Sequence, residues 1–313
     1  MMRLPFRMII ALAGVAAVTA GCGGGSSSGA ATSTTGQGVQ VVRPPAVIDA
    51  PTKVADTAAG AVGYREVGAG SPILLIMGLG GSMDDWTPSF VATLATGHKV
   101  IMLDNAGVGQ TAPLASPLSI TGMANQTSAL ISTLQLGRVA VLGWSMGGMI
   151  AQALVVLHPA QVSKIVLAAT QPGTGHAVPV PPAAAAAVAS SNPAAVISVL
   201  FPESDTAAAQ AYVAGITRYP DSYRASSTTI AAQGSAVEQW TAGKDQAGPR
   251  FGAVRLPLLV ADGTLDELDP SANDRSLADS VPEAKLILYP GAGHAFLFQD
   301  MASFLPAVER FLR

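Results

Sequence analysis

The feature that most constrains this chain is a series of short apolar runs separated by longer segments with helical patterning. The runs are continuous rather than alternating, so both faces of each would be buried. This is typical of parallel strands covered by helices on each side of a sheet. A strand-like alternation at 61–67 precedes them. The apolar runs lie at residues 72–77, 99–104, 138–143, 164–169, 257–262 and 284–289.

Helix candidates occupy the intervals between these runs, at residues 120–135, 146–157, 271–279 and 300–312. Strands that alternate with helices predict an α/β fold class with a doubly wound, mostly parallel sheet. We expect the core to comprise residues 41–171 and 251–313. The 49% of hydrophobic residues supplies ample material for one large core.

Residues 172–250 interrupt this alternation. They contain an alanine-rich helix candidate at 183–191, a second near 205–218 and a third near 222–242, with no convincing strand. A helical segment placed before the last two strands predicts a lid over the sheet edge.

The stretch "GWSMGG" at 143–148 places Ser145 between a predicted strand and a predicted helix. The spacing Gly143-x-Ser145-x-Gly147 is the nucleophile-elbow pattern, a turn tight enough to need small neighbours. A serine hydroxyl becomes a good nucleophile only when a base removes its proton. The sequence must therefore also supply a histidine at the same sheet edge.

The chain has four histidines. We expect His98 to be a surface turn residue, and His158 ends the predicted helix after the elbow, about three turns from Ser145. His176 begins the predicted lid and is an alternative pocket residue. His294, in "YPGAGHAF", follows the last strand, and loops after parallel strands share the carboxyl edge with the elbow. His294 is the predicted base.

An acid must orient the imidazole and stabilise its charged form. The loop after the 257–262 run reads "GTLDELDP" and, with the end of that run, offers Asp262, Asp266, Glu267 and Asp269. Asp262 is expected to cap the turn at the strand end. Asp266 lies far enough along the loop to reach His294, and Asp269 is the alternative.

Acyl transfer also needs two backbone donors aimed at the developing oxyanion. One is expected from Met146, directly after the nucleophile. The other is expected from Leu79 in "MGLGGSMDDW", where glycines after the first apolar run allow close approach to a ligand.

Taken together, residues 60–313 resemble α/β-hydrolase-fold proteins. The resemblance rests on "MGLGGSMDDW", "LDNAGVGQT", "GWSMGG", "GTLDELDP" and "GAGH" in that order. It implies a serine hydrolase acting on small esters, lactones or other carbonyl substrates, with no metal or organic cofactor. The family usually has histidine before the glycine of the oxyanion loop, where this chain has Met77.

The N-terminus predicts export. Arg3 and Arg7 precede an apolar run at 8–18, which is too short to span a bilayer. We expect residues 1–21 to be a signal peptide and 22–40 a flexible Gly/Ser/Thr tether. "TAGC" resembles a lipoprotein lipobox, so Cys22, the only cysteine, is the expected lipidation site and membrane anchor. The protein would then be extracytoplasmic, or secreted if Cys22 is not acylated.

A net charge of −3 gives no indication of nucleic-acid binding. The leading hypothesis is an esterase with an apolar substrate, and Trp86, Trp144 and Trp240 hint at an apolar acyl pocket unless they simply pack the lid onto the core. One alternative is a cofactor-free haloperoxidase or perhydrolase with the same triad. Another is a surface binding lipoprotein without turnover.

Overall fold

The structure, a computed structural model, describes residues 46–190, 192–220 and 222–313. The predicted signal peptide, the tether and Cys22 lie outside these residues. Within the described part of the chain, every helix is too short or too polar to cross a membrane.

An eight-stranded sheet with the order β1-β2-β4-β3-β5-β6-β7-β8 forms the centre of the described part. β1 pairs antiparallel with β2, β2 pairs antiparallel with β4, and all other pairs are parallel. The strands are β1 (Lys53–Thr57), β2 (Gly60–Gly68), β3 (Ser71–Ile76), β4 (His98–Leu103), β5 (Val139–Trp144), β6 (Val162–Ala168), β7 (Leu258–Gly263) and β8 (Lys285–Tyr289).

The apolar runs form strands whose two faces are both covered by helices. The last four residues of β3, β4, β5 and β6 are all buried, as is the whole of β7. Leu74 pairs with Ile101 on one side and Val141 on the other, which sets the register at the centre of the sheet. The α/β fold class predicted from these runs is confirmed. The β1 strand was not predicted.

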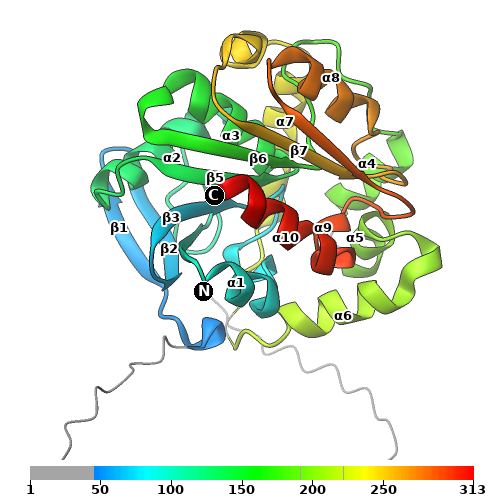
Figure 1. Cartoon of the computed structure of the whole chain (residues 1–313), viewed down its shortest axis with the longest axis horizontal. Helices are drawn as coiled ribbons and strands as arrows, with labels where there is room; N and C mark the ends of the chain where they lie inside the picture. The colour runs from blue at the N-terminus through cyan, green and yellow to red at the C-terminus, as the bar shows by residue number, and fades with distance from the viewer. Residues whose placement is uncertain (1–45, 191, 221) are drawn as a thin grey trace, which may run out of the picture. The chain divides into compact units, whose positions relative to one another are not determined.

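Helices cover both faces of the sheet (Figure 1). α2 (Ile120–Thr133), α3 (Met146–Leu157) and α8 (Ala272–Ser280) pack on one face, and their side chains share a core with Leu74 and Val141. On the other face lie α1 (Pro88–Leu94), α9 (Phe296–Gln299) and α10 (Met301–Leu312). Because β3, β5, β7 and β8 run parallel, their carboxyl ends lie at one edge of the sheet. The predicted site residues follow these ends.

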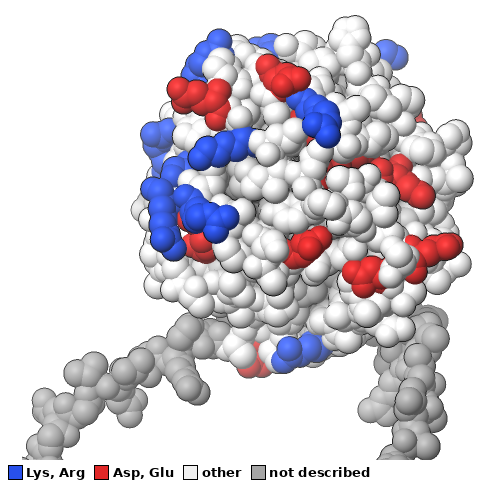
Figure 2. All heavy atoms as spheres, turned by 45° about the vertical axis from the view of Figure 1, so that its right-hand side comes forward, with Lys and Arg blue, Asp and Glu red and all other residues white. Residues whose placement is uncertain are grey.

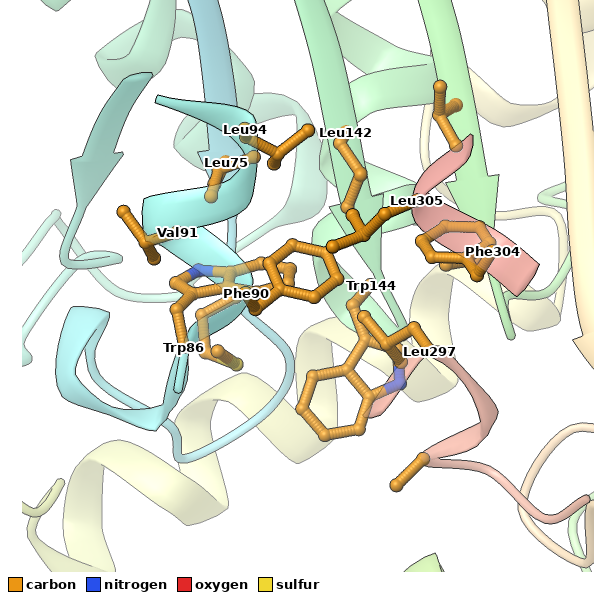
Figure 3. Close-up of a cluster of buried hydrophobic side chains, with 14 of the residues drawn as sticks. Leu75, Trp86, Phe90, Val91, Leu94, Leu142, Trp144, Leu297, Phe304 and Leu305 are labelled. Atoms are coloured by element: carbon orange, nitrogen blue, oxygen red, sulfur yellow. The ribbon is translucent and has the colours of Figure 1, made fainter. Parts of the chain in front are cut away.

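Aromatic side chains fill the core between β5, α1 and α10 (Figure 3). Trp86 and Phe90 stack with ring centroids 5.3 Å apart, and Trp86 lies 6.3 Å from Trp144. Each fully buried ring stabilises the fold by about 2–3 kcal/mol through area burial. The residue before Ser145 is thus fixed by packing.

Residues 172–250, here called the helical insertion, join β6 to β7. Their described residues form helices and connecting loops without a strand, as predicted. Asp205 caps α6 by accepting from the N–H of Ala208 at 3.0 Å, and Asn192 caps α5, which was not predicted. The α-helices are α4 (Pro182–Ala189), α5 (Pro193–Leu200), α6 (Thr206–Ile216) and α7 (Ser227–Thr241).

Short 3-10 turns complete the fold: η1 (Val47–Asp49), η2 (Met83–Asp85), η3 (Pro159–Gln161), η4 (Glu203–Asp205) and η5 (Gly248–Ala253). The surface carries few charges. On the face shown in Figure 2, Lys and Arg gather on the left and large areas have no charged side chain.

Candidate active site

Ser145 occupies a sharp turn between β5 and α3. Its backbone has φ 57° and ψ −124°, a region that costs a non-glycine residue about 1–3 kcal/mol and persists only where the surroundings enforce it. Here the N–H of Ser145 donates to the carbonyl of Ala168 at 2.9 Å, and Thr170 Oγ1 donates to the carbonyl of Ser145 at 2.7 Å. A Cβ on Gly147 would collide with the backbone of β3, so the turn requires glycine there.

Asp266 and His294 meet across two loops. His294 Nδ1 donates to Asp266 Oδ2 at 2.6 Å, and both side chains are buried. The other oxygen of Asp266 accepts from the N–H groups of Leu268 and Asp269, at 2.7 and 2.8 Å. Backbone donors therefore hold the carboxylate with one oxygen facing the imidazole. Asp269, the alternative acid, accepts instead from Asn273 Nδ2 at 2.9 Å.

The electrostatic environment favours a protonated imidazole at His294. Burial acts to lower the pKa of His294. The charge of Asp266, its hydrogen bond and the charge of Asp269 act in the opposite direction. The net effect raises the pKa of His294 above its ordinary value of 6.5. Such a side chain can accept a proton and remain stable as a cation, which a general base must do.

Ser145 and His294 line the same cavity of about 410 Å³, at the edge where β3, β5, β7 and β8 end. Leu79 and Trp144 also line it. Much of the remaining wall is aliphatic and comes from the helical insertion, with Val196, Ile197, Leu200, Ile216 and Ile230. The predicted nucleophile Ser145, the buried His294 oriented by Asp266 and an apolar chamber thus share one space.

Residues 71–300 match the family described as the alpha/beta hydrolase fold. The chain belongs to this family. A solved alpha/beta hydrolase fold protein from Chitinophaga pinensis superimposes with a TM-score of 0.77 at 27% identity, covering 85% of this chain and 98% of that one.

Two curated relatives of this α/β hydrolase cover most of its folded part. One is the putative non-heme bromoperoxidase BpoC of Mycobacterium tuberculosis, 28% identical over 266 residues, or 79% of this chain and 96% of the relative. The other is the poly(3-hydroxyalkanoate) depolymerase of Ectopseudomonas oleovorans, 29% identical over 250 residues, or 78% of this chain and 84% of the relative. Membership in the family and relatives named as enzymes support an enzyme.

The glycine-rich loop after β3 is held from three sides in this α/β hydrolase. Asn105 Nδ2 donates to the carbonyl of Met77 at 2.8 Å, and the N–H of Met83 donates to Asp104 Oδ1 at 2.7 Å. From the helical insertion, the fully buried Gln233 accepts from the N–H of Gly80 at 2.8 Å. Gln233 could not be predicted from the sequence, because a lone glutamine in a helix belongs to no motif.

Both predicted oxyanion donors belong to segments beside Ser145. Leu79 lines the cavity, and Met146 is the first residue of α3. N–H groups in the first turn of a helix lack partners within the helix, so they are free to bind a ligand. Gly78 brings the loop close: a Cβ built there would lie 3.1 Å from Cβ of Ser145.

The other three histidines lie elsewhere. His98 begins β4, with Nε2 3.3 Å from Glu309 Oε2. His158 ends α3, as expected, with Nε2 2.8 Å from Asn125 Oδ1. His176 is exposed and, among the described residues, is outside the set that lines the cavity, so the structure does not support its alternative role as a pocket residue.

Of the three tryptophans, Trp144 alone is among the described residues lining the cavity. Its Nε1 donates to the carbonyl of His294 at 3.0 Å, so the side chain that precedes Ser145 also fixes the loop that carries His294. Trp86 and Trp240 are fully buried in the core instead, and Trp240 Nε1 donates to the carbonyl of Gln171 at 3.0 Å. These two tryptophans therefore pack in the core, which was the alternative to a role in the acyl pocket.

Proposed function

We propose that this α/β hydrolase is a serine hydrolase that cleaves carboxylic ester-like bonds through an acyl-enzyme on Ser145. One observation carries the proposal: His294, oriented by Asp266 at 2.6 Å, opens onto the same cavity as a serine held in a strained elbow.

In the proposed mechanism, His294 accepts the proton of Ser145 as the hydroxyl oxygen attacks the substrate carbonyl. Asp266 holds the proton on Nδ1, which leaves Nε2 as the base, and it stabilises the imidazolium that forms. The imidazolium then protonates the leaving alcohol. Water activated by His294 releases the acid in the second half of the reaction.

The backbone N–H groups of Leu79 and Met146 are the proposed donors to the oxyanion. Loss of one such donor costs about 3–4 kcal/mol in transition-state stability in enzymes of this kind. The contact between Gly80 and Gln233 supports the loop that presents Leu79. The helical insertion would therefore contribute to positioning this donor as well as to covering the cavity.

An apolar acyl or alcohol group fits the aliphatic wall. Residues from α5, α6 and α7 supply most of it, and burial of such surface is worth about 25 cal/mol per Å². We expect p-nitrophenyl esters with medium acyl chains to be cleaved with higher kcat/KM than the acetate.

A fluorophosphonate probe tests the nucleophile. The probe should label the wild-type protein, and Ser145→Ala should lose labelling and at least about 10⁴-fold of esterase activity. Ser227→Ala is the matched control, since Ser227 lines the same cavity without a proposed role, and it should label normally. A wild-type protein that is folded by circular dichroism but unlabelled would overturn the proposal and favour the surface binding lipoprotein.

A second candidate reaction is peracid formation from a carboxylic acid and hydrogen peroxide on the same residues. The similarity to a relative named as a non-heme bromoperoxidase favours it. Peroxide-dependent bromination of monochlorodimedone, measured beside ester cleavage, separates the two. Bromination that exceeds ester cleavage in kcat/KM would make the perhydrolase the principal activity.

A further inference from the structure

Three buried aspartates gather behind the loop that carries Asp266. Asp262 lies near the end of β7, Asp269 lies in the loop, and Asp274 lies in the first turn of α8. We call these three the aspartate cluster. Each offers a carboxylate oxygen within 4.8 Å of the others, and their exposed fractions are 0%, 1% and 0%.

Most oxygens of the aspartate cluster receive no N–H or O–H donor. Asp262 Oδ1 accepts from the N–H of Gly263 at 2.7 Å, and Asp269 Oδ1 accepts from Asn273 Nδ2. Within the described part of the chain, the second oxygens of both residues and both oxygens of Asp274 have no donor. The fully buried Asp274 is instead paired with the carboxyl groups of Asp262 and Asp269, and the charge of Asp266 lies nearby.

Among the described residues, no Lys or Arg side chain forms an ion pair with these three carboxyl groups, and the nearest titrating cation is His294, which interacts with Asp269. In this region of the described chain, the one ion pair joins Asp266 to His294. Unpaired buried charge is costly, so the cluster must take up either protons or a cation from solution.

We propose that Asp262, Asp269 and Asp274 form a binding site for one calcium ion. The donors are all carboxylate oxygens, which select a hard cation such as Ca²⁺, Mg²⁺ or Mn²⁺. Mg²⁺ requires near-ideal octahedral geometry and usually retains several waters, which suits a fully buried site poorly. Ca²⁺ accepts irregular arrangements and bidentate carboxylates.

The position of the cluster assigns the ion a structural role. It would join the end of β7 to the first turn of α8 across the loop between them. The N–H of Asp269 donates to Asp266 Oδ1, so an ion bound to Asp269 would also fix the loop around Asp266. The chemistry at Ser145 requires no step at this ion.

The test measures metal content and thermal stability. Protein stripped with EDTA and passed over a chelating resin is titrated with CaCl₂, MgCl₂ or MnCl₂ at pH 7. We expect one bound calcium per chain by mass spectrometry of the metal, and a rise in Tm of about 5 °C or more at a hundredfold excess over Kd, larger than with magnesium. Asp274→Asn should weaken calcium binding at least tenfold.

The matched control is Asp279→Asn, which removes an exposed aspartate from the same helix and should bind calcium like the wild type. If Asp274→Asn does not fold, Asp262→Asn and calorimetric titration of the stripped wild type give the same information. Stripped wild-type protein that binds no calcium and shows no change in Tm would overturn the proposal. Protons would then hold the cluster, and Asp274→Asn would be as stable as the wild type or more so.

Discussion

Two groups of aspartates flank the candidate active site, and their charges are compensated in different ways. Asp84 and Asp104 are buried beside the glycine-rich loop near Arg65, with the half-buried Asp85 next to them, and we call these three the arginine-paired cluster. The aspartate cluster lies behind the acid loop on the other side of the cavity. Each cluster has three carboxyl groups, but among the described residues only the arginine-paired cluster forms an ion pair with an arginine, Arg65.

In the arginine-paired cluster, the guanidinium of Arg65 donates to Asp84 Oδ1 and lies against the ring of Tyr219, 5.3 Å from its centroid. Asp104 accepts from Met83, and Asp85 from Ser82 at 2.9 Å. Arginine remains charged at every physiological pH. This cluster therefore has a cation fixed by the fold, which helps to hold the loop that presents Leu79.

On the acid-loop side, the compensating group for Asp266 is a histidine that titrates. The aspartate cluster behind it depends on protons or on the proposed calcium. One wall of the site thus contains a fixed ion pair between Arg65 and Asp84. The other wall contains a titrating histidine beside Asp266 and, under the proposal, a calcium ion.

The largest expected effect comes from neutralising the acid that faces the histidine. Asp266→Asn should lower kcat/KM by about 10³–10⁴-fold, because the amide cannot hold the required tautomer or stabilise the imidazolium. The charge and hydrogen bond that raise the pKa of His294 would be lost, so the acid limb of the pH–kcat/KM profile should move to lower pH.

Steady-state kinetics from pH 5 to 9 measure both effects for Asp266→Asn. Glu267→Gln changes an exposed neighbour and should behave like the wild type. An unchanged acid limb would mean that Asp266 does not set the charge state of His294.

Removing the fixed cation should have the next largest effect. Arg65→Met should destabilise the protein by about 3–5 kcal/mol, because it leaves buried carboxylates without their partner. Lys53→Met breaks an exposed pair with Glu66 at 2.5 Å, and it should cost at most about 1 kcal/mol. Urea unfolding at pH 7 measures both. Equal losses of unfolding free energy in the two variants would mean that the buried ion pair of Arg65 stabilises the protein no more than the exposed pair of Lys53.

The smallest predicted effect is a pH dependence of stability within the arginine-paired cluster. Burial, opposed by Met83 and reinforced by Asp84, raises the pKa of Asp104 from 3.8 to about 6. The folded state then binds this proton more tightly than the unfolded state. The corresponding stability is present below pH 4 and is lost as pH rises through 6, by about 3 kcal/mol at most.

Asp104→Asn should therefore flatten the fall in unfolding free energy between pH 4 and 6.5, measured by urea unfolding across that range. Asp56→Asn, at an exposed position of β1, should leave the slope unchanged. A slope that survives in Asp104→Asn would place the titration in other groups, the aspartate cluster first.

Most of the fold could be predicted from the sequence because strands and helices have local periodicities. Continuous apolar runs can bury both faces only in a covered sheet, and the residue ranges at 72–77, 138–143 and 257–262 agree with β3, β5 and β7 to within one residue. α5 was missed because it is only eight residues long and follows the predicted helix at 183–191 almost directly, so no separate pattern distinguishes it.

The candidate site was predictable in part. Ser145 has a turn motif, and His294 has a position after the last strand, so each could be named from its immediate surroundings. Asp266 and Asp269 have nearly the same sequence context. Only the closure of the loop, with two N–H groups donating to one oxygen of Asp266, decides which carboxylate faces the imidazole.

The sequence by itself therefore determined the α/β architecture and where along the chain a nucleophile and a base would have to lie, since these depend on near neighbours. The tertiary structure decided the partner of His294, the support of Gly80 by Gln233, 153 positions away, and the meeting of three aspartates behind the acid loop. These contacts join separate segments of the chain, and they form only when strands and helices pack in one arrangement.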